Sequence, residues 1–417
     1  MTLNSFKSTS LFLFILMIFQ LIACAQNQQP PLKKVRKEIT EIKTGAEQTQ
    51  QYLDLLKEKN IAIVANQTSV LSILQQTENA SNKILSKKDT LHLVDYLYHL
   101  KGIKIDKVFA PEHGFRGNAD AGEVIKDGFD TKTGLPIISL YGKNKKPSAK
   151  QLLGIEVMVF DIQDVGARFY TYISTLHYIM EACAENGIAV LILDRPNPNG
   201  HYIDGPVLEA PHQSFVGMHK VPVVYGMTIG EYGQMINGEK WLKNGIQCDL
   251  TVIPLKNYTH NSAYSLAIKP SPNLPNDKAI NLYPSLCLFE GTNVSAGRGT
   301  AMQFQIYGSP YLDKRSFSFT PMSNDGAKYP KYNNEICYGE NLLKTANLTQ
   351  LNLAWLLKAY KQNTEKDFFN SFFTNLAGTK KLQDQIESGF SEKEIRKTWQ
   401  KDLKAFQKIR KKYLLYK

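Results

Sequence analysis

The chain has 417 residues, 43% of which are hydrophobic, and it carries a formal net charge of +12. This length suggests two domains, and the apolar content is ample for well-packed cores. Beyond the N-terminal region no apolar stretch is long enough to span a membrane, which excludes a protein with several membrane-spanning helices.

The N-terminus has the three parts of an export signal. Lys7 gives a positive start, residues 11–21 form a short apolar run, and the segment closes with Leu-Ile-Ala before Cys24. The run is shorter than the roughly 18–20 apolar residues that a spanning helix needs. A Cys directly after Leu-Ile-Ala resembles the lipobox of bacterial lipoproteins, in which that Cys carries the acyl chains. An ordinary cleaved signal that contains a Cys is the alternative.

We therefore expect residues 1–23 to be a lipoprotein signal peptide and residues 24–40 to be a flexible tether, with Cys24 as the lipidation site. Several acyl chains hold a protein more firmly than the marginal binding of a single chain. The mature protein would then lie in the periplasm or elsewhere in the cell envelope, anchored by its lipid to a bacterial membrane.

Short apolar runs alternate with helical patterns in the first two thirds of the chain. The runs show little polar alternation, which is typical of strands covered on both faces. We predict a mostly parallel, Rossmann-like α/β sheet with flanking helices, in a domain of residues 41–270. The predicted strands are residues 61–65, 107–110, 137–140, 157–162, 189–193 and 250–254, and the predicted helices are residues 48–58, 90–101, 174–185 and 229–241.

After about residue 270 the pattern changes, because Asn and Tyr become frequent and the loops lengthen. We predict a C-terminal α+β domain of residues 271–417, with a helix at residues 352–361. The last 25 residues contain ten Lys or Arg against two acids, a balance that nucleic-acid or membrane surfaces would attract. However, Ile395, Trp399, Leu403 and Phe406 recur every three or four residues. This spacing predicts an amphipathic helix with a solvated charged face, and no nucleic-acid partner.

The sequence lacks the usual signatures of bound cofactors. No GxGxxG follows the first strand, and no GxxxxGK[ST] occurs, so we predict no nucleotide cofactor. Besides Cys24 the chain has Cys183, Cys248, Cys287 and Cys337, with no CxxC pair and no His at zinc-ligand spacing. We therefore predict no metal site, and we expect these four residues to be buried free thiols.

Polar side chains gather where the predicted strands end, which is where open α/β sheets bind their ligands. Acids and amides bond sugar hydroxyls and aromatic faces stack on sugar C–H surfaces, so these clusters fit a carbohydrate site. The alternative for each cluster is a satisfied polar network that caps the next helix, but three such strand ends together favour a binding site. The residues are Asn66 after the first strand, Asp161, Gln163, Asp164, Arg168, Tyr170 and Tyr172 after the fourth, and Asp194, Arg195 and Asn197 after the fifth.

The loop after the second predicted strand places Glu112, His113 and Arg116 within five residues of one another. Glu112 lies between two Phe residues and suits a general acid, although a simple pair between the Glu and the Arg is an equal alternative. A metal site fails on spacing, because this is not HExxH. Further along, a Gly-rich segment carries Glu290, Asn293 and Arg298, and it could bind an anion or form a tight structural turn.

These segments occur together, in this order, in a known family. The sequence resembles the exo-β-N-acetylmuramidases of the NamZ family, long known as a domain of unknown function. The resemblance implies a glycoside hydrolase that releases N-acetylmuramic acid from the non-reducing ends of peptidoglycan glycans, with its active cleft between a Rossmann-like domain and a C-terminal domain. The motifs, which span residues 65–300, are ANQTS, APEHGFRG, FDIQDVGARFYTYISTL, LDRPNPNG, YGMTIGEYG, KPSPNLP and YPSLCLFEGTNVSAGRGT.

The resemblance implies that Glu112 is the catalytic acid and that a nearby Tyr, either Tyr170 or Tyr172, assists it. Asp164 and Glu290 are candidates for a second carboxylate. We favour the alternative in which the 2-acetamido group of the substrate attacks the anomeric carbon.

Selectivity for the lactyl carboxylate of muramic acid needs a cation, for which the candidates are Arg298, Arg168 and Arg116. The other polar residues named above are candidate sugar contacts, and the partners expected are peptidoglycan fragments and, through the lipid, a membrane. Two rival functions are a non-catalytic lipoprotein that binds wall glycans and a serine hydrolase. The sequence has neither a GxSxG motif nor an SxxK motif with suitable partners, so no motif supports a serine hydrolase.

Overall fold

The computed structural model describes residues 41–78, 84–117, 127–314 and 317–416. The predicted signal peptide, the tether and the lipidation site at Cys24 lie outside these residues. Residues Ile42–Lys417 belong to one compact unit. Within the described ranges, no helix is long and apolar enough to cross a membrane.

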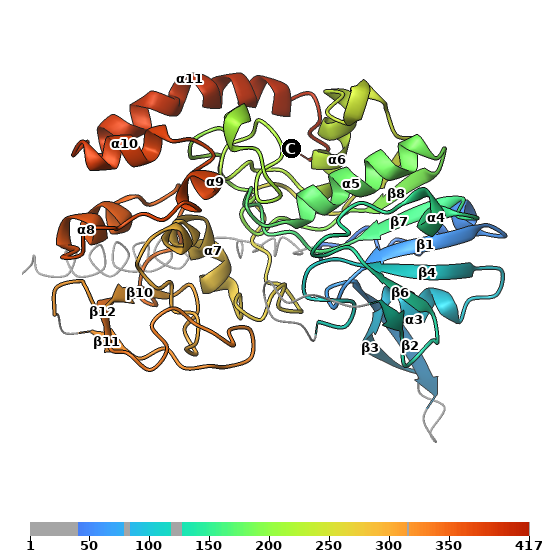
Figure 1. The fold of residues 1–417 in the computed structure, drawn as a ribbon. Helices are drawn as coiled ribbons and strands as arrows, with labels where there is room; N and C mark the ends of the chain where they lie inside the picture. The colour runs from blue at the N-terminus through green and yellow to red at the C-terminus, as the bar shows by residue number, and fades with distance from the viewer. Residues whose placement is uncertain (1–40, 79–83, 118–126, 315–316, 417) are drawn as a thin grey trace, which may run out of the picture. The chain divides into compact units, whose positions relative to one another are not determined.

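The centre of this unit is a seven-stranded sheet with the order β5-β6-β4-β1-β7-β8-β9 (Figure 1). All neighbouring strands are parallel except β5, which runs antiparallel to β6 at one edge. The prediction of a mostly parallel sheet is confirmed, and the six predicted strands correspond to β1, β4, β6, β7, β8 and β9. The strands are β1 (Asn60–Ala65), β4 (Lys104–Ala110), β5 (Gly128–Phe129), β6 (Pro136–Ser139), β7 (Val157–Asp161), β8 (Ala189–Leu193) and β9 (Leu250–Ile253).

Both faces of the sheet are buried, and this explains why the strands read as continuous apolar runs. Alternate residues of a strand enter different cores: Met158 and Phe160 of β7 join one core, whereas Val157 and Val159 join the other. Helices α5 (Tyr172–Glu185) and α6 (Ile229–Gly238) contribute to the first core. The short helices α2 (Leu53–Leu56) and α3 (Leu93–Tyr98) contribute to the second. The connections also contain α4 (Ala149–Leu152) and the 3₁₀ turns η1 (Thr49–Gln51), η2 (Ala210–His212) and η3 (Lys243–Gly245).

The helix predicted at residues 90–101 begins later than expected, at Leu93. Residues 90–92 are not helical: they end β3 (Ile84–His92), which pairs antiparallel with β2 (Val70–Glu78) as a separate two-stranded sheet. Leu91, Leu93, Val94 and Leu97 share a helical spacing, but the helix begins only at Leu93. In the most widely separated pair of β2 and β3, His92 lies opposite Val70, which is 22 residues earlier in the chain. This pairing overrides the local helical pattern.

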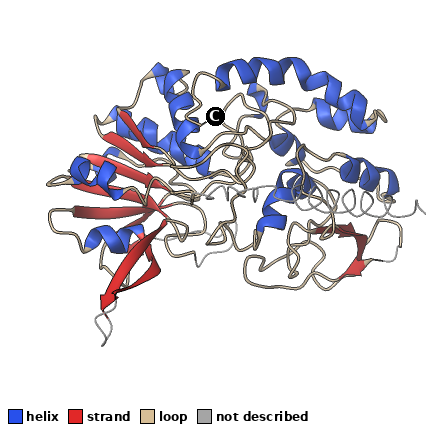
Figure 2. Cartoon of the chain, turned by 180° about the vertical axis from the view of Figure 1, so that it is seen from behind, coloured by secondary structure: helices blue, strands red, loops and turns tan. Residues whose placement is uncertain are grey.

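The later part of the chain has helices and a small sheet, as the α+β prediction requires; the boundary at residue 270 stays a prediction. Figure 2 shows this sheet as a group of strands separate from the large one. The C-terminal helix is amphipathic as predicted, with Ile395, Trp399, Leu403 and Phe406 buried. The elements are α7 (Asp277–Leu286), η4 (Cys287–Gly291), the sheet β10 (Ile306–Ser309), β12 (Cys337–Asn341) and β11 (Ser318–Phe319), then α8 (Ala354–Gln362), α9 (Phe373–Ala377), α10 (Lys381–Glu387) and α11 (Glu392–Arg410).

A single buried cation ties these two parts of the unit together. The fully buried guanidinium of Arg168 donates hydrogen bonds to the carbonyls of Pro206 and Val221, both at 2.8 Å. It also donates to the carbonyls of Leu376 and Ala377 at the end of α9, at 2.9 and 2.7 Å. Burial lowers the pKa of Arg168 to about 9, so the side chain remains protonated at neutral pH.

The close approach of Gly378 to Arg168 shows how tightly this guanidinium is packed. The φ of Gly378, +73°, is left-handed, and an added Cβ would lie 2.5 Å from Nη2 of Arg168. Gly389 has nearly the same φ, +75°, but nothing lies within 4 Å of its Cβ position. The two glycines therefore offer a matched pair in which only one substitution reaches Arg168.

We predict that Gly378→Ala lowers the free energy of unfolding by at least about 2 kcal/mol more than Gly389→Ala. Both variants carry the strain of a left-handed Ala, about 1–2 kcal/mol, but only the first displaces charge-assisted hydrogen bonds worth about 1.5–3 kcal/mol each. Urea unfolding of the wild type and both variants measures the difference. Equal losses would show that Arg168 does not hold this position.

Candidate active site

A cavity of about 750 Å³ lies beyond the carboxyl ends of the sheet strands, within the size range of small-molecule sites. One wall comes from the loops after β4, β6 and β7, and the other from residues after 270. Its polar lining residues are Glu112, His113, Tyr141, Tyr170, Thr171, Ser271, Asn273, Glu290, Arg298, Lys328 and Lys331. Its aromatic lining residues are Phe169, Phe215, Tyr283, Phe304, Tyr329 and Phe372.

Glu112 lies two residues after β4, in a sharp turn where His113 and Gly114 both have positive φ. Thr171, just before α5, donates a hydrogen bond of 2.8 Å to Oε2 of Glu112. The carboxyl group also interacts with the hydroxyl of Tyr141, which follows β6; burial and this neighbour together raise the pKa of Tyr141. Two hydroxyl groups therefore orient the half-buried carboxyl group of Glu112.

The predicted pair Tyr170 and Tyr172 lies behind this carboxyl group. Tyr170 donates to the carbonyl of Pro270 at 2.8 Å, and burial raises its pKa. The hydroxyl of Tyr172 accepts a hydrogen bond from Asn66 at 2.8 Å and donates to the backbone carbonyl of Glu112 at 3.4 Å. Tyr170 lines the cavity, whereas Tyr172 and Asn66 support the Glu112 loop from beneath.

Glu290 and Arg298 form an ion pair on the opposite wall. Nε of Arg298 donates to Oε1 of Glu290 at 3.0 Å, and both side chains are about one-quarter exposed, 25% and 27%. Burial alone would lower the pKa of Arg298, but the charge and hydrogen bond of Glu290 raise it above its usual value. The guanidinium also lies 5.2 Å from the ring centroid of Phe304. Arg298 is therefore a fixed cation that faces the cavity.

Lys331 holds this Gly-rich loop in place. Its ammonium group donates to the carbonyls of Phe289, Thr292 and Val294. Burial is the main reason that the pKa of Lys331 is lowered. Three backbone acceptors from one segment fix the residues on both sides of Glu290.

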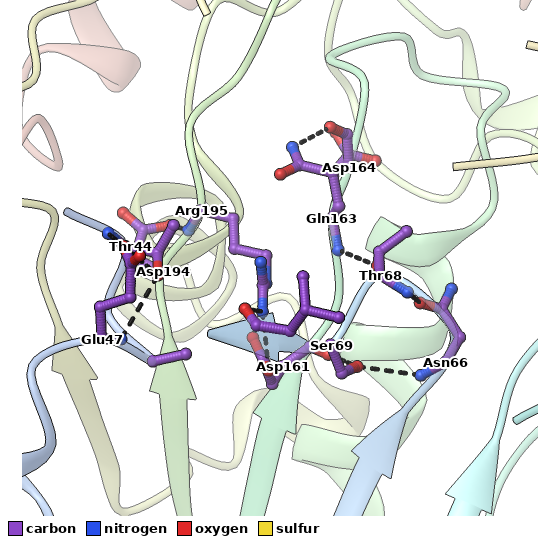
Figure 3. A network of polar contacts seen from close by, with 12 residues as sticks. Thr44, Glu47, Asn66, Thr68, Ser69, Asp161, Gln163, Asp164, Asp194 and Arg195 are labelled. Carbon is purple, nitrogen blue, oxygen red and sulfur yellow. Dashed lines mark hydrogen bonds and ion pairs between the residues drawn. The ribbon is translucent and has the colours of Figure 1, made fainter. Parts of the chain in front are cut away.

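The crevice between β1 and β7 is filled by the protein itself. Strands β4 and β6 lie on one side of β1, and strands β7, β8 and β9 lie on its other side. The crevice between β1 and β7 is therefore the switch point at which such sheets commonly bind ligands. Arg195 donates to both carboxylate oxygens of Asp161, at 2.6 and 2.8 Å (Figure 3). Gln163 donates through its backbone N–H to Thr68 at 3.0 Å and through its amide to two carbonyls. The cavity that remains beside them measures only about 60 Å³.

Two further predicted acids are buried away from the cavity. Asp164 accepts from the N–H of Gly166 at 2.8 Å and from the hydroxyl of Tyr225, and burial raises its pKa to about 6. Asp194 accepts from Thr228 at 2.7 Å and from Tyr416, near the C-terminus, at 2.5 Å. Burial raises the pKa of Asp194 to about 7.

Four other predicted residues also bind protein groups instead of lining the cavity. Arg116 donates to Asp95 and Asp130, both at 2.7 Å, and Arg168 binds the four carbonyls described above. The amide of Asn197 donates to the carbonyl of Met227 at 2.8 Å, and that of Asn293 to Asn363 at 2.9 Å. Of the predicted residues, the structure thus brings Glu112, His113, Tyr170, Glu290 and Arg298 together in the cavity wall. The roles of all these residues stay predictions.

The sequence analysis missed three polar residues that shape the cavity: Tyr141, Thr171 and Lys331. Tyr141 directly follows a predicted strand, so the strand-end rule used for the other clusters would have included it. Thr171 lies between the two predicted tyrosines but is separated from Glu112 by 59 residues. Lys331 lies in a loop with no recognisable pattern, and only its three carbonyl partners reveal its function.

Of the four cysteines that the structure describes, only Cys287 lines the cavity. Cys183, Cys248, Cys287 and Cys337 are buried free thiols, as expected. Across the described residues, no group of three or more His, Cys, Asp or Glu is arranged to hold a metal ion.

Comparison with known proteins gives consistent matches along the chain. The family described as "Exo-beta-N-acetylmuramidase NamZ, N-terminal" matches residues 61–278, and its C-terminal counterpart matches residues 281–416. The Peptidoglycan beta-N-acetylmuramidase NamZ of Bacillus subtilis (strain 168) is 36% identical, over 98% of this chain and 100% of that protein.

Two crystal structures of DUF1343 family proteins from Bacteroides fragilis NCTC 9343 also match. The structure at 1.30 Å resolution is 45% identical to this chain, with a TM-score of 0.79. The match covers 91% of this chain and 99% of the chain in that structure. The structure at 1.65 Å resolution is 28% identical with a TM-score of 0.74, and covers 90% and 99%. Both support the arrangement of a large α/β sheet with a C-terminal part.

The raised pKa of Asp194 predicts a pH-dependent stability. Between the usual value of 3.8 and about 7, the folded protein binds a proton that the unfolded chain has lost. The contribution of Asp194 to stability is therefore complete at low pH and is lost as the pH rises through about 7. Asp194→Asn cannot titrate, so its stability relative to the wild type should rise between pH 4.5 and 7.5, by at most about 1.4 kcal/mol per pH unit.

Urea unfolding at four pH values across this range provides the measurement. Asp249→Asn is a matched control, because Asp249 is exposed and lies directly before β9. A difference between Asp194→Asn and the wild type that does not change with pH would contradict the assignment.

Proposed function

The chain belongs to the NamZ family of exo-β-N-acetylmuramidases, and from this membership we propose that it releases N-acetylmuramic acid from the non-reducing ends of peptidoglycan glycans. The observation that carries the proposal is the match to a peptidoglycan β-N-acetylmuramidase over 98% of this chain and 100% of that protein. The position of Glu112 in a sugar-sized cavity, lined from both family regions, supports it.

Glu112 is the general acid in this proposal. It donates its proton to the glycosidic oxygen while the bond from that oxygen to the anomeric carbon breaks, through an oxocarbenium-like transition state. The hydroxyl groups of Thr171 and Tyr141 hold the carboxyl group in one orientation. Tyr141 is therefore a better candidate for the assisting tyrosine than Tyr170 or Tyr172, whose hydroxyls are directed to backbone carbonyls.

The nucleophile in this proposal is the substrate's own 2-acetamido oxygen, which attacks the anomeric carbon as the leaving sugar departs. Asp164 is buried outside the cavity lining and bonded to Tyr225, which favours a structural role. Glu290 does line the cavity, but its carboxylate is held by Arg298. Glu290 then acts by fixing Arg298, and water opens the cyclic intermediate in the second step.

Arg298 is the cation that we propose for the 3-O-lactyl carboxylate. Among the three candidate arginines it alone lines the cavity, because Arg116 is held by two aspartates and Arg168 by four carbonyls. Its Nε binds Glu290, and an Arg presents further N–H groups that can grip a carboxylate.

The location of the enzyme is a separate proposal. We infer from the charged start, the short apolar run and the lipobox-like sequence that residues 1–23 direct export and that Cys24 carries the lipid anchor. The enzyme would then work in the cell envelope, where peptidoglycan fragments are present.

Glu112→Gln should lower turnover of a muramic-acid glycoside by at least about 100-fold, because a positioned general acid contributes about 10²–10⁴-fold. The amide oxygen can still accept the hydrogen bond from Thr171, so the unfolding midpoint should not change. Glu185→Gln serves as control, since Glu185 is a surface residue that pairs with Lys146 outside the cavity lining. Activity within about tenfold of the wild type would exclude Glu112 as the acid.

Arg298→Ala should reduce kcat/KM on muramic-acid glycosides far more than on the matching N-acetylglucosaminides, which lack the lactyl carboxylate. Arg298→Lys should recover part of the loss, because it keeps the charge but not the planar fork. Equal losses on both substrates would contradict carboxylate recognition by this residue. Saturable binding of glycans by the wild type with no sugar released would favour the rival function, a glycan-binding lipoprotein.

A further inference from the structure

The outward face of α11 carries a straight row of lysines. Its apolar residues enter the core, and the lysines recur at spacings of four, four, three, four and three residues. At 3.6 residues per turn these positions fall within one narrow stripe on the side opposite the buried residues. We call this the lysine face; it consists of Lys393, Lys397, Lys401, Lys404, Lys408 and Lys411, all of which are exposed.

The acids of the same helix offset the lysine face only in part: Glu394 acts electrostatically on Lys397, but each acid has another partner as well. Glu394 caps the helix by accepting from the backbone N–H and hydroxyl of Ser391, at 2.8 and 2.6 Å. Glu392 pairs with Arg396 at 3.1 Å, and Asp402 acts electrostatically on Lys381 of α10. Within the part of the chain that the structure describes, no residue of the lysine face forms an ion pair, whereas the nearby Lys412 pairs with Glu239.

The six charges are close enough to act together. Neighbouring lysines on the stripe are about 4.5–6 Å apart along the helix axis, which is less than the screening length of about 8 Å at physiological salt. The whole row extends over about 27 Å. Figure 1 shows α11 along the upper edge of the described unit, and all six lysines of the row are exposed.

The chemistry of this face fits a planar surface of mobile anions. It contains no Arg to grip a phosphate or carboxylate bidentately and no aromatic ring to stack on a base or sugar. Ammonium groups in a row need no fixed partner geometry, and lipid headgroups can rearrange beneath them. Each Lys near an anionic bilayer contributes about 1 kcal/mol of attraction.

We propose that the lysine face docks the enzyme on a bilayer of anionic phospholipid. The short connection between Cys24 and the compact unit agrees with a membrane as the partner. Ile42, where the unit begins, is only 18 residues after Cys24. Fully extended, they span at most about 60 Å. If Cys24 is the anchor proposed above, the lysine face stays within reach of the membrane. Docking would then fix which side of the enzyme faces the wall.

The test uses the chain from residue 25 onward, which keeps the whole compact unit but has neither the predicted signal peptide nor Cys24. Co-sedimentation compares vesicles of phosphatidylglycerol and phosphatidylcholine in a 3:7 ratio with vesicles of phosphatidylcholine alone. We expect at least tenfold tighter binding to the anionic vesicles, and a strong loss when salt is raised from 50 to 300 mM. The variant Lys397→Gln, Lys401→Gln, Lys404→Gln, Lys408→Gln should lose at least tenfold.

A matched control has four exposed lysines on other elements replaced: Lys101→Gln, Lys256→Gln, Lys344→Gln, Lys366→Gln. Both variants lose four positive charges, so only the position of the charges differs. Turnover of a soluble muramic-acid glycoside and the unfolding midpoint should be unchanged in both, which separates this proposal from the proposed function. Equal losses in the two variants, absence of binding by the wild type, or tighter binding to a soluble poly(glycerol phosphate) than to vesicles would each overturn the proposal.

Discussion

The guanidinium of Arg168 is the interaction on which the geometry of the cavity depends. It carries a charge into a fully buried site with no carboxylate partner and distributes it over four carbonyls, two of them at the end of α9. The residues that follow it in the chain include Thr171, which orients Glu112. Leu376 of α9 and Phe372, just before this helix, line the opposite wall. One side chain therefore contacts both walls of the cavity, and its hydrogen bonds offset part of the desolvation of the charge.

The same end of the sheet performs two separate tasks. At the switch point between β1 and β7, the pair of Asp161 and Arg195 and the polar groups around it fill the crevice where related sheet topologies bind ligands. The loop that carries Glu112 lies one strand away, after β4, where the C-terminal part of the chain provides the facing wall with Glu290 and Arg298. The buried network thus makes the strand ends rigid. These rigid strand ends hold Glu112 against hydroxyl groups from two other loops.

The parallel sheet was predictable from the apolar runs. Each strand is buried on both faces, and this burial requires apolar residues whichever strands lie beside it. The hairpin of β2 and β3 was not predictable in this way, since its stability depends on pairing between distant residues and Leu91 fits a helical spacing equally well. In the site, the chemistry of its loop made Glu112 a candidate, and the family resemblance, not that chemistry, selected it as the acid. Asp161 and Asn197 were chosen on the same chemical grounds, but buried polar networks and sugar sites use the same residue types. Contacts such as Thr171 with Glu112, 59 residues apart, leave no local pattern.

The most direct test of the account is to identify the first product released from a defined peptidoglycan tetrasaccharide. With N-acetylmuramic acid at the non-reducing end, the account predicts free N-acetylmuramic acid and a trisaccharide as the first products, detected by mass spectrometry. With N-acetylglucosamine at that end, it predicts no release. Disaccharide products from an internal cut, or equal cleavage of both tetrasaccharides, would contradict an exo-acting muramidase whose cavity accepts one terminal muramic acid.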